Sequence, residues 1–135
     1  MPTPLPFSPT IALLTVGRTW EADFAEALKP LGLTTRKYGL LGHIRSTPGI
    51  SFSELARRSR VKVQSAHTAV AGLVADGLVD DGTRHAGSAS TLAVTERGEA
   101  LLDEVASVLG HLDAELADRF PELRDGLRAM VDRMR

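Results

Sequence analysis

Four basic side chains stand close together near the middle of this 135-residue chain. This basic cluster consists of Arg57, Arg58, Arg60 and Lys62. No acidic residue lies between positions 54 and 76. Cations of this kind bind phosphate oxygens, which gives affinity without reading sequence. In a chain whose net charge is −1, the cluster indicates one surface that binds a polyanion. An ordinary solvated surface is the plainer alternative.

The residues directly after these bases have the chemistry to read a nucleic acid. This polar cluster consists of Gln64, Ser65, His67 and Thr68. A glutamine amide can pair with the edge of an adenine, and hydroxyl groups can bond to base edges or phosphates. The imidazole of His67 can do either. These four side chains are the predicted base contacts, although each is also compatible with a solvated surface.

The stretch that carries both clusters predicts two helices joined by a tight turn. Ser51 and Glu54 form a capping-box pattern at the start of a first helix, over about residues 52–59. A second helix is expected over about 63–76, with Gly77 as its C-cap. The residues expected to face inward are Ala66, Ala69, Val70, Leu73 and Val74. The polar cluster then faces outward, and the pair forms a helix-turn-helix that can enter a DNA groove.

A short β-hairpin is predicted after this helix pair. Leu78 and Val79 begin one strand, and residues 91–94 form the returning strand. The polar stretch between them is rich in turn residues. Arg84 and His85, near the tip of this hairpin, are candidate phosphate or minor-groove contacts.

Amphipathic helices are predicted on both sides of this central region. Ser8 caps the first of them and Thr34 the second, which stops at Thr47. Thr95 caps a long helix, and Pro121 begins a last one. Their apolar stripes comprise Leu13, Trp20, Phe24, Leu28 and Leu31, then Leu101, Val105, Leu109, Leu112, Leu116 and Phe120, and finally Leu123, Leu127, Met130, Val131 and Met134. Apolar stripes of this kind are normally buried against another helix, which can belong either to the same chain or to a second copy.

This order of elements, together with several short motifs, resembles the MarR-type winged helix-turn-helix transcription regulators. The motifs are Leu33-Thr34 followed by Tyr38, Pro48-Gly49-Ile50-Ser51, Ser53-Glu54-Leu55-Ala56, Val61, Leu73, Gly77-Leu78-Val79 and Leu92-x-Val94-Thr95-Glu96-Arg97-Gly98. The resemblance covers residues 33–102 and implies a mainly α (α+β) fold in a single domain, residues 1–135. A winged lobe with a two-stranded β wing is expected over 33–98, and dimerisation helices over 8–32 and 99–135.

The same resemblance implies a function. The family forms homodimers that bind palindromic operators in double-stranded DNA, so we expect a sequence-specific transcription regulator, most simply a repressor. A small aromatic effector is expected to bind between the dimerisation helices and the lobe. The residues expected to line its pocket are Trp20, Phe24, Tyr38 and His43. Core packing is the plainer alternative for these side chains.

The wing departs from the acid-x-arginine pattern that is usual near its tip in the family. Residues 84–90 offer only Arg84 and His85 as cations. This departure keeps a second hypothesis open, in which the winged helix binds a protein instead of DNA.

Composition and motif content exclude several other classes of protein. The chain has no cysteine, which excludes disulfides and thiolate metal sites. Its histidines are dispersed, and no metal-binding or nucleophile motif is present, so we expect neither catalysis nor a bound metal or cofactor. No apolar run approaches the ~20 residues that cross a bilayer, and the first residues lack the basic region of a secretion signal. We therefore expect a cytoplasmic protein without membrane contact.

Overall fold

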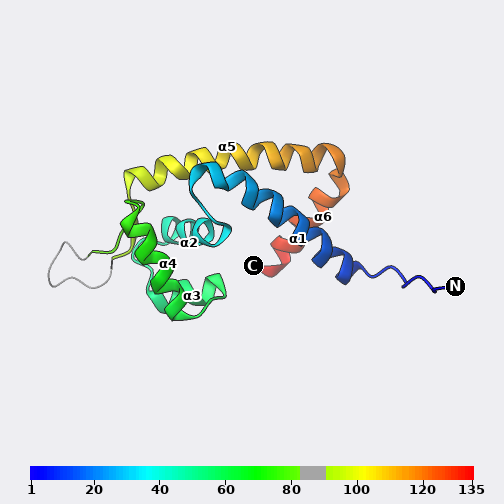
Figure 1. The fold of residues 1–135 in the computed structure, drawn as a ribbon, viewed down its shortest axis with the longest axis horizontal. Coiled ribbons are helices and arrows are strands. Elements are labelled where there is room, and N and C mark those ends of the chain that lie inside the picture. The colour runs from blue at the N-terminus through cyan, green and yellow to red at the C-terminus, as the bar shows by residue number, and fades with distance from the viewer. Residues whose placement is uncertain (83–90) are drawn as a thin grey trace.

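The computed structural model describes residues 1–82 and 91–135. This part of the chain forms six α-helices, one short 3₁₀ helix and a two-stranded antiparallel sheet (Figure 1). The elements are α1 (Pro9–Leu28), η1 (Lys29–Leu31), α2 (Thr35–Ser46), α3 (Phe52–Ser59), α4 (Val63–Ala75), β1 (Val79–Asp80), β2 (Ala93–Val94), α5 (Glu96–Arg119) and α6 (Pro121–Met134). The predicted mainly α, winged helix-turn-helix fold is confirmed. Helices α3 and α4 are the helix pair, and β1 and β2 form the base of the wing.

Four helices begin at a hydroxyl residue that accepts a hydrogen bond from the main-chain N–H three positions later. These N-caps are Ser8 for α1, Thr34 for α2, Ser51 for α3 and Thr95 for α5. Each bond satisfies an amide that the helix itself leaves without a partner. The four predicted helix starts are therefore confirmed.

The predicted capping box at α3 is only half formed. Ser51 Oγ accepts from Glu54 N at 3.1 Å, as expected. The Glu54 carboxylate does not return the bond to Ser51, because it binds two arginines of the same helix.

The lobe is built around the buried face of α2. Leu40, Leu41 and Ile44 on this face have no solvent-exposed area. The other fully buried large side chains are Leu28, Leu55, Val70, Leu73, Leu92 and Val105. These residues join α1, α3, α4 and α5 to α2 in one core. Because α4 is fixed through its apolar side, its opposite side is held toward solvent.

The wing is attached to the lobe at the first turn of α5. Val79 pairs with Val94, and Asp80 with Ala93. Thr95 joins the two sides of this junction, since its Oγ1 donates to the Gly77 carbonyl at 2.6 Å while also capping α5. Gly98 is buried directly against the main chain of residue 78, a position that leaves no room for a side chain.

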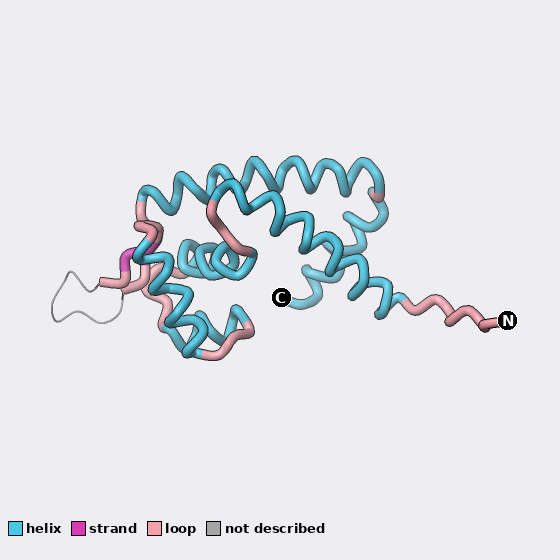
Figure 2. Tube along the Cα trace, in the orientation of Figure 1, coloured by secondary structure: helices cyan, strands magenta, loops and turns pink. Residues whose placement is uncertain are grey.

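The two ends of the chain extend beyond the lobe and expose apolar side chains. Figures 1 and 2 show the N-terminal part of α1 leading away from α2, α3 and α4, and α6 turning back from the far end of α5. Among the described residues, every exposed large hydrophobic side chain except Val63 lies within residues 1–16 or 120–134. Helix α6 contributes no buried residue at all. Within one chain, the predicted stripe of α6 is therefore left largely exposed, with Leu127 half-buried.

The predicted stripe of α5 is buried or half-buried near the lobe, and it becomes exposed at the far end of the helix. Val105 is buried, and Leu101 and Leu109 are half-buried against the core. Leu102, which the predicted stripe omits, is also buried, whereas Phe120 is 48% exposed. The difference arises because only the first half of α5 lies over the lobe (Figure 1).

Candidate nucleic-acid interface

Helix α4 presents one outward face at the edge of the lobe. Ala66, Val70 and Leu73 are buried, as predicted, while Ala69 and Val74 are half-buried. On the other side, Gln64, His67 and Thr68 are exposed and Ser65 is half-buried. All four members of the polar cluster therefore come together on the outer part of α4, in its first two turns.

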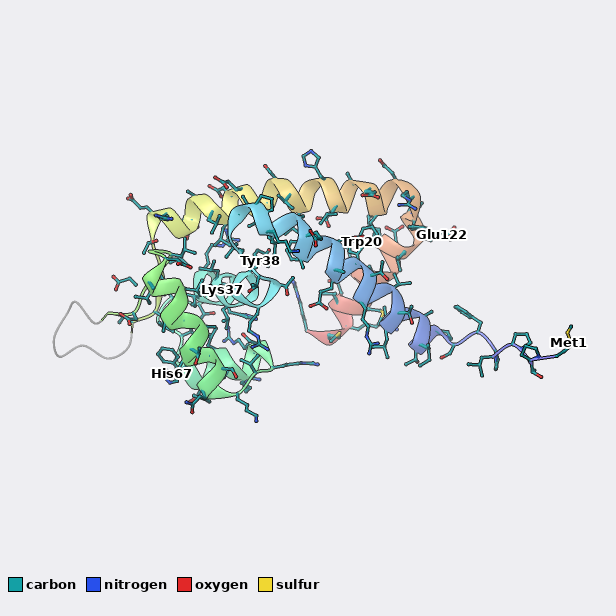
Figure 3. The ribbon with its side chains drawn as sticks, in the orientation of Figure 1. Met1, Trp20, Lys37, Tyr38, His67 and Glu122 are labelled. Atoms are coloured by element: carbon teal, nitrogen blue, oxygen red, sulfur yellow. The ribbon has the colours of Figure 1, made fainter. Side chains whose placement is uncertain are left out.

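Two members of this cluster are already engaged within the chain. Thr68 Oγ1 donates to the main-chain carbonyl of Gln64 at 3.1 Å, a local bond that uses its hydroxyl proton within the helix. The His67 ring stacks on Phe52 of α3, with ring centroids 3.8 Å apart and planes 15° from parallel. Figure 3 shows His67 where α3 and α4 meet. Within the described part of the chain, the Gln64 side chain makes no hydrogen bond, so its amide is available to a ligand.

The basic cluster divides into paired and unpaired cations. Arg57 Nε donates to Glu54 Oε2 at 2.9 Å, and Arg57 Nη2 donates to the other oxygen of the same carboxylate, Oε1. Arg58 Nε donates to Glu54 Oε1 at 2.9 Å, and its Nη1 donates to Thr47 Oγ1, also at 2.9 Å. Arg60 and Lys62 make no ion pair with any described residue. These two exposed cations flank the turn that leads into α4.

The arginines determine the charge state of Glu54. Hydrogen bonds from Arg57 and then Arg58 lower the pKa of this carboxyl to about 2, and the same contact raises the pKa of Arg57. A carboxyl pKa that is lower in the folded state stabilises the protein above the ordinary carboxyl range. That contribution is lost as the pH falls through about 2. Glu54 is therefore ionised at every pH at which nucleic-acid binding is normally measured.

Helix α4 lacks the side-chain cap that four other helices have. Its N-cap residue is Lys62, in extended backbone, and no side chain accepts from the first amides of the helix. Unsatisfied amides and the positive end of the helix dipole favour an anion at this position. The start of α4 therefore presents main-chain donors beside the cations of Arg60 and Lys62.

The four predicted effector residues are half-buried, but they do not all converge within one chain. Phe24 of α1 and Tyr38 of α2 meet edge to face, with ring centroids 5.4 Å apart and an interplanar angle of 87°. Trp20 precedes Phe24 by about one helical turn. Since His43 follows Tyr38 by five residues, the two lie about 140° apart around α2. Figure 3 shows Trp20 on α1 and Tyr38 on the neighbouring α2.

An open cleft of about 450 Å³ lies elsewhere on the lobe. It is lined by Leu31, Gly32, Asp76, Leu78, Arg97, Ala100, Leu101 and Glu104. None of the four predicted effector residues lines it.

Several other outcomes concern the predicted sites. Arg84 and His85 lie outside the described residues. Among the residues that the structure describes, no three His, Cys, Asp or Glu side chains are grouped to hold a metal ion. None of the described helices has both the length and the apolar composition that a membrane span requires.

Sequence reasoning missed the pairing of Glu54 with Arg57 and Arg58, although spacings of three and four residues are the usual sign of such pairs on a helix.

Comparisons with known proteins agree with this architecture. A sequence model described as the MarR family matches residues 31–87. The HTH-type transcriptional repressor Rv2887 of Mycobacterium tuberculosis is 31% identical over 121 residues, which is 87% of either chain. Its crystal structure in complex with DNA has a TM-score of 0.77 and 27% identity, and covers 96% of this chain and 98% of that one. Its complex with salicylic acid has a TM-score of 0.75 and 28% identity, with the same coverage of 96% and 98%.

Proposed function

Because the chain belongs to the MarR family, we propose that it is a transcriptional repressor that binds a palindromic operator as a homodimer. The observation that carries the proposal is the outward face of α4. An unpaired glutamine amide, uncapped main-chain donors and two unpaired cations lie together at the start of one exposed helix. This arrangement suits a helix that enters a major groove with phosphates at its N-terminus. The related repressor Rv2887 has been crystallised with DNA.

A second copy of the chain is the proposed cover for the exposed apolar ends. Leu13, Leu14 and Val16 of α1 and Met130 and Val131 of α6 are each about half exposed in one chain. Apolar surface on this scale marks an interaction site in a soluble protein. A symmetric dimer would also place two copies of α4 on successive turns of one side of the DNA. The palindromic operator follows from that symmetry.

The proposed roles within the interface follow from residue type and exposure. Gln64 and Ser65 contact bases through hydrogen bonds, Thr68 adds an apolar contact through its methyl group, and His67 is held by its stack on Phe52. Arg60 and Lys62 contact phosphates directly, whereas Arg57 and Arg58 contact phosphates in competition with Glu54. Arg84 and His85 of the wing remain proposed phosphate or minor-groove contacts.

Replacing Gln64 with alanine tests direct base reading. We expect Gln64→Ala to weaken operator binding by about 1–3 kcal/mol and to relax selectivity at one base-pair position in each half-site. The measurement is fluorescence anisotropy on an operator series with single base-pair changes. Affinity for random-sequence DNA should stay unchanged, since an uncharged amide contributes little to phosphate binding. Equal weakening on every sequence would exclude a base-reading role for Gln64.

Replacing Lys62 with serine should separate stability from DNA binding. The extended backbone at this N-cap (φ −69°, ψ 150°) suits a serine, whose hydroxyl can accept from the first turn of α4. Lys62→Ser should therefore raise the free energy of unfolding by about 1 kcal/mol. It should also weaken binding to all DNA sequences and reduce the salt slope by about 0.9 per protomer. Urea unfolding and anisotropy at several salt concentrations measure the two effects. An unchanged slope would mean that Lys62 contacts no phosphate.

A small aromatic effector is proposed to release the repressor from DNA. The support is the contact of Phe24 with Tyr38 beside the half-buried Trp20, together with the salicylic acid complex of Rv2887. Since His43 lies on another side of α2, a complete pocket would need the second copy. Salicylate titration should raise the melting temperature and lower operator affinity in the wild type. A Trp20→Ala/Tyr38→Ala variant that responds to salicylate as the wild type does would exclude this location.

The decisive experiment for the proposed function is DNA binding as a function of salt. The purified protein should bind DNA from upstream of its own gene more tightly than scrambled DNA of the same composition. Log affinity should fall linearly with log salt concentration. Absence of binding even at low salt would favour the alternative function, a winged helix that binds a protein. The proposal also includes a cytoplasmic location, where chromosomal DNA is accessible, and no catalytic activity.

A further inference from the structure

We infer that Glu54 is an internal counter-charge that weakens sequence-independent DNA binding by competing with phosphates for Arg57 and Arg58. The inference rests on the proposed function and adds to it a residue that limits how strongly the lobe binds the DNA backbone. Glu54 lies in the first turn of α3, and α3 lies at the end of the lobe opposite α5 (Figure 1).

One carboxylate accepts hydrogen bonds from both arginines. Arg57 donates to both oxygens of Glu54, in the two-pronged arrangement that arginine also uses for phosphate. Arg58 donates through Nε to one of these oxygens and through Nη1 to Thr47. Four of the ten N–H donors of the two guanidinium groups, both Nε–H groups among them, are therefore already used within the chain.

The charge balance has a direct consequence for DNA binding. Glu54, Arg57 and Arg58 together carry one net positive charge instead of two. A phosphate that approaches either arginine also approaches the Glu54 carboxylate, which repels it. Binding that depends only on phosphates follows the number of charges neutralised, with a slope of about 0.9 in log affinity per phosphate. Glu54 therefore removes about one phosphate contact from each protomer.

The Glu54–Arg57 and Glu54–Arg58 pairs are exposed enough for a DNA phosphate to replace Glu54 as the partner of an arginine. The Arg57 side chain is 70% exposed and those of Arg58 and Glu54 are 35% and 34% exposed. Exposed ion pairs contribute little to stability and are readily replaced. The contact therefore competes with DNA phosphates without contributing much to the fold, and its removal should alter binding more than it alters stability.

The test compares Glu54→Gln with the wild type on random-sequence DNA over a range of salt. Glutamine keeps the size of the side chain and removes its charge. We expect the slope of log affinity against log salt to steepen by about 0.9 per protomer, or about 1.8 for a dimer. For a dimer, lowering the salt concentration fourfold should then add roughly a tenfold gain in affinity beyond that of the wild type. The melting temperature of each variant shows that the fold is retained.

Two further variants make the result specific. Glu26→Gln removes the same charge from another i,i+3 pair, which joins Glu26 of α1 to Lys29 of η1, outside α3 and α4. It should leave the slope unchanged. The double variant Glu54→Gln/Arg57→Gln should return the slope to its wild-type value, because the released cation is removed as well.

The outcomes separate this inference from the proposed function. If the wild type binds DNA and Glu54→Gln leaves the slope unchanged, or if Glu26→Gln steepens it equally, the role of Glu54 is wrong and the proposed function stands. If no variant binds DNA at low salt, the proposed function itself fails.

Discussion

The Gly98→Ala variant should lose about 3 kcal/mol of unfolding free energy, with a melting temperature roughly 10 °C lower. A Cβ at position 98 would lie 2.3 Å from the Leu78 carbonyl oxygen and 2.6 Å from Val94 Cγ1. The carbonyl cannot move freely, because it accepts from Thr95 N at 3.0 Å. The strain therefore spreads to the junction between α5 and the wing. Because the obstacle is main chain, the cost should fall at the upper end of the range for overpacking.

Gly110 of the same helix provides the matched control. A Cβ at position 110 would meet no atom within 4 Å. Gly110→Ala should therefore gain up to about 1 kcal/mol from helix propensity alone. Thermal and urea unfolding of the two variants measure the contrast. If both variants melt at or above the wild-type temperature, the close approach of α5 to the main chain at Leu78 is wrong.

The predictable part of the fold is the part that local chemistry determines. Helix starts at Ser8, Thr34, Ser51 and Thr95 follow from the hydroxyl group and the backbone next to it, so a few neighbouring residues are sufficient. The inward face of α4 follows from its 3.6-residue periodicity in the same way. The order of these elements, together with the short motifs within residues 33–98, predicted the winged helix-turn-helix.

The less predictable part depends on which partner a side chain finds in three dimensions. The capping-box pattern at Ser51 does not reveal that Glu54 prefers Arg57 and Arg58 to its own helix terminus. The stack of His67 on Phe52 joins two helices, and their crossing geometry is not encoded in either segment alone. The contacts assigned to Gln64 and its neighbours remain predictions, because the position of DNA on α4 depends on a second molecule.

The end of α5 illustrates a different limit. Phe120 belongs to the same apolar stripe as Val105, yet Val105 is fully buried and Phe120 is 48% exposed. Periodicity identifies the face that needs cover, but it does not say whether the cover comes from the same chain. That distinction is what separates a lobe residue from an interface residue, and it makes α6 the most informative helix to mutate.

Replacing Val131 with aspartate should dissociate the proposed dimer and weaken operator binding by a factor of about 10²–10⁴. Val131 is 49% exposed in one chain and lies on the apolar side of α6 with Leu127 and Met134. A second copy would bury it, and an unpaired carboxylate in such an interface costs several kcal/mol. Each lobe would then bind its half-site alone, without the effective concentration that the partner provides. The lobe itself should stay folded, because α6 contributes no residue to its core.

Ala129→Asp is the control that isolates the interface. It adds the same charge to the same helix two residues away, which places it on the opposite face of α6. Sedimentation velocity should show a dimer for the wild type and for Ala129→Asp, and a monomer for Val131→Asp. Anisotropy on the operator should follow the same order. A dimeric Val131→Asp variant with wild-type affinity would exclude α6 from the interface. A wild type that is monomeric at micromolar concentration would instead mean that two copies assemble only on DNA, or that the apolar ends bind a different partner.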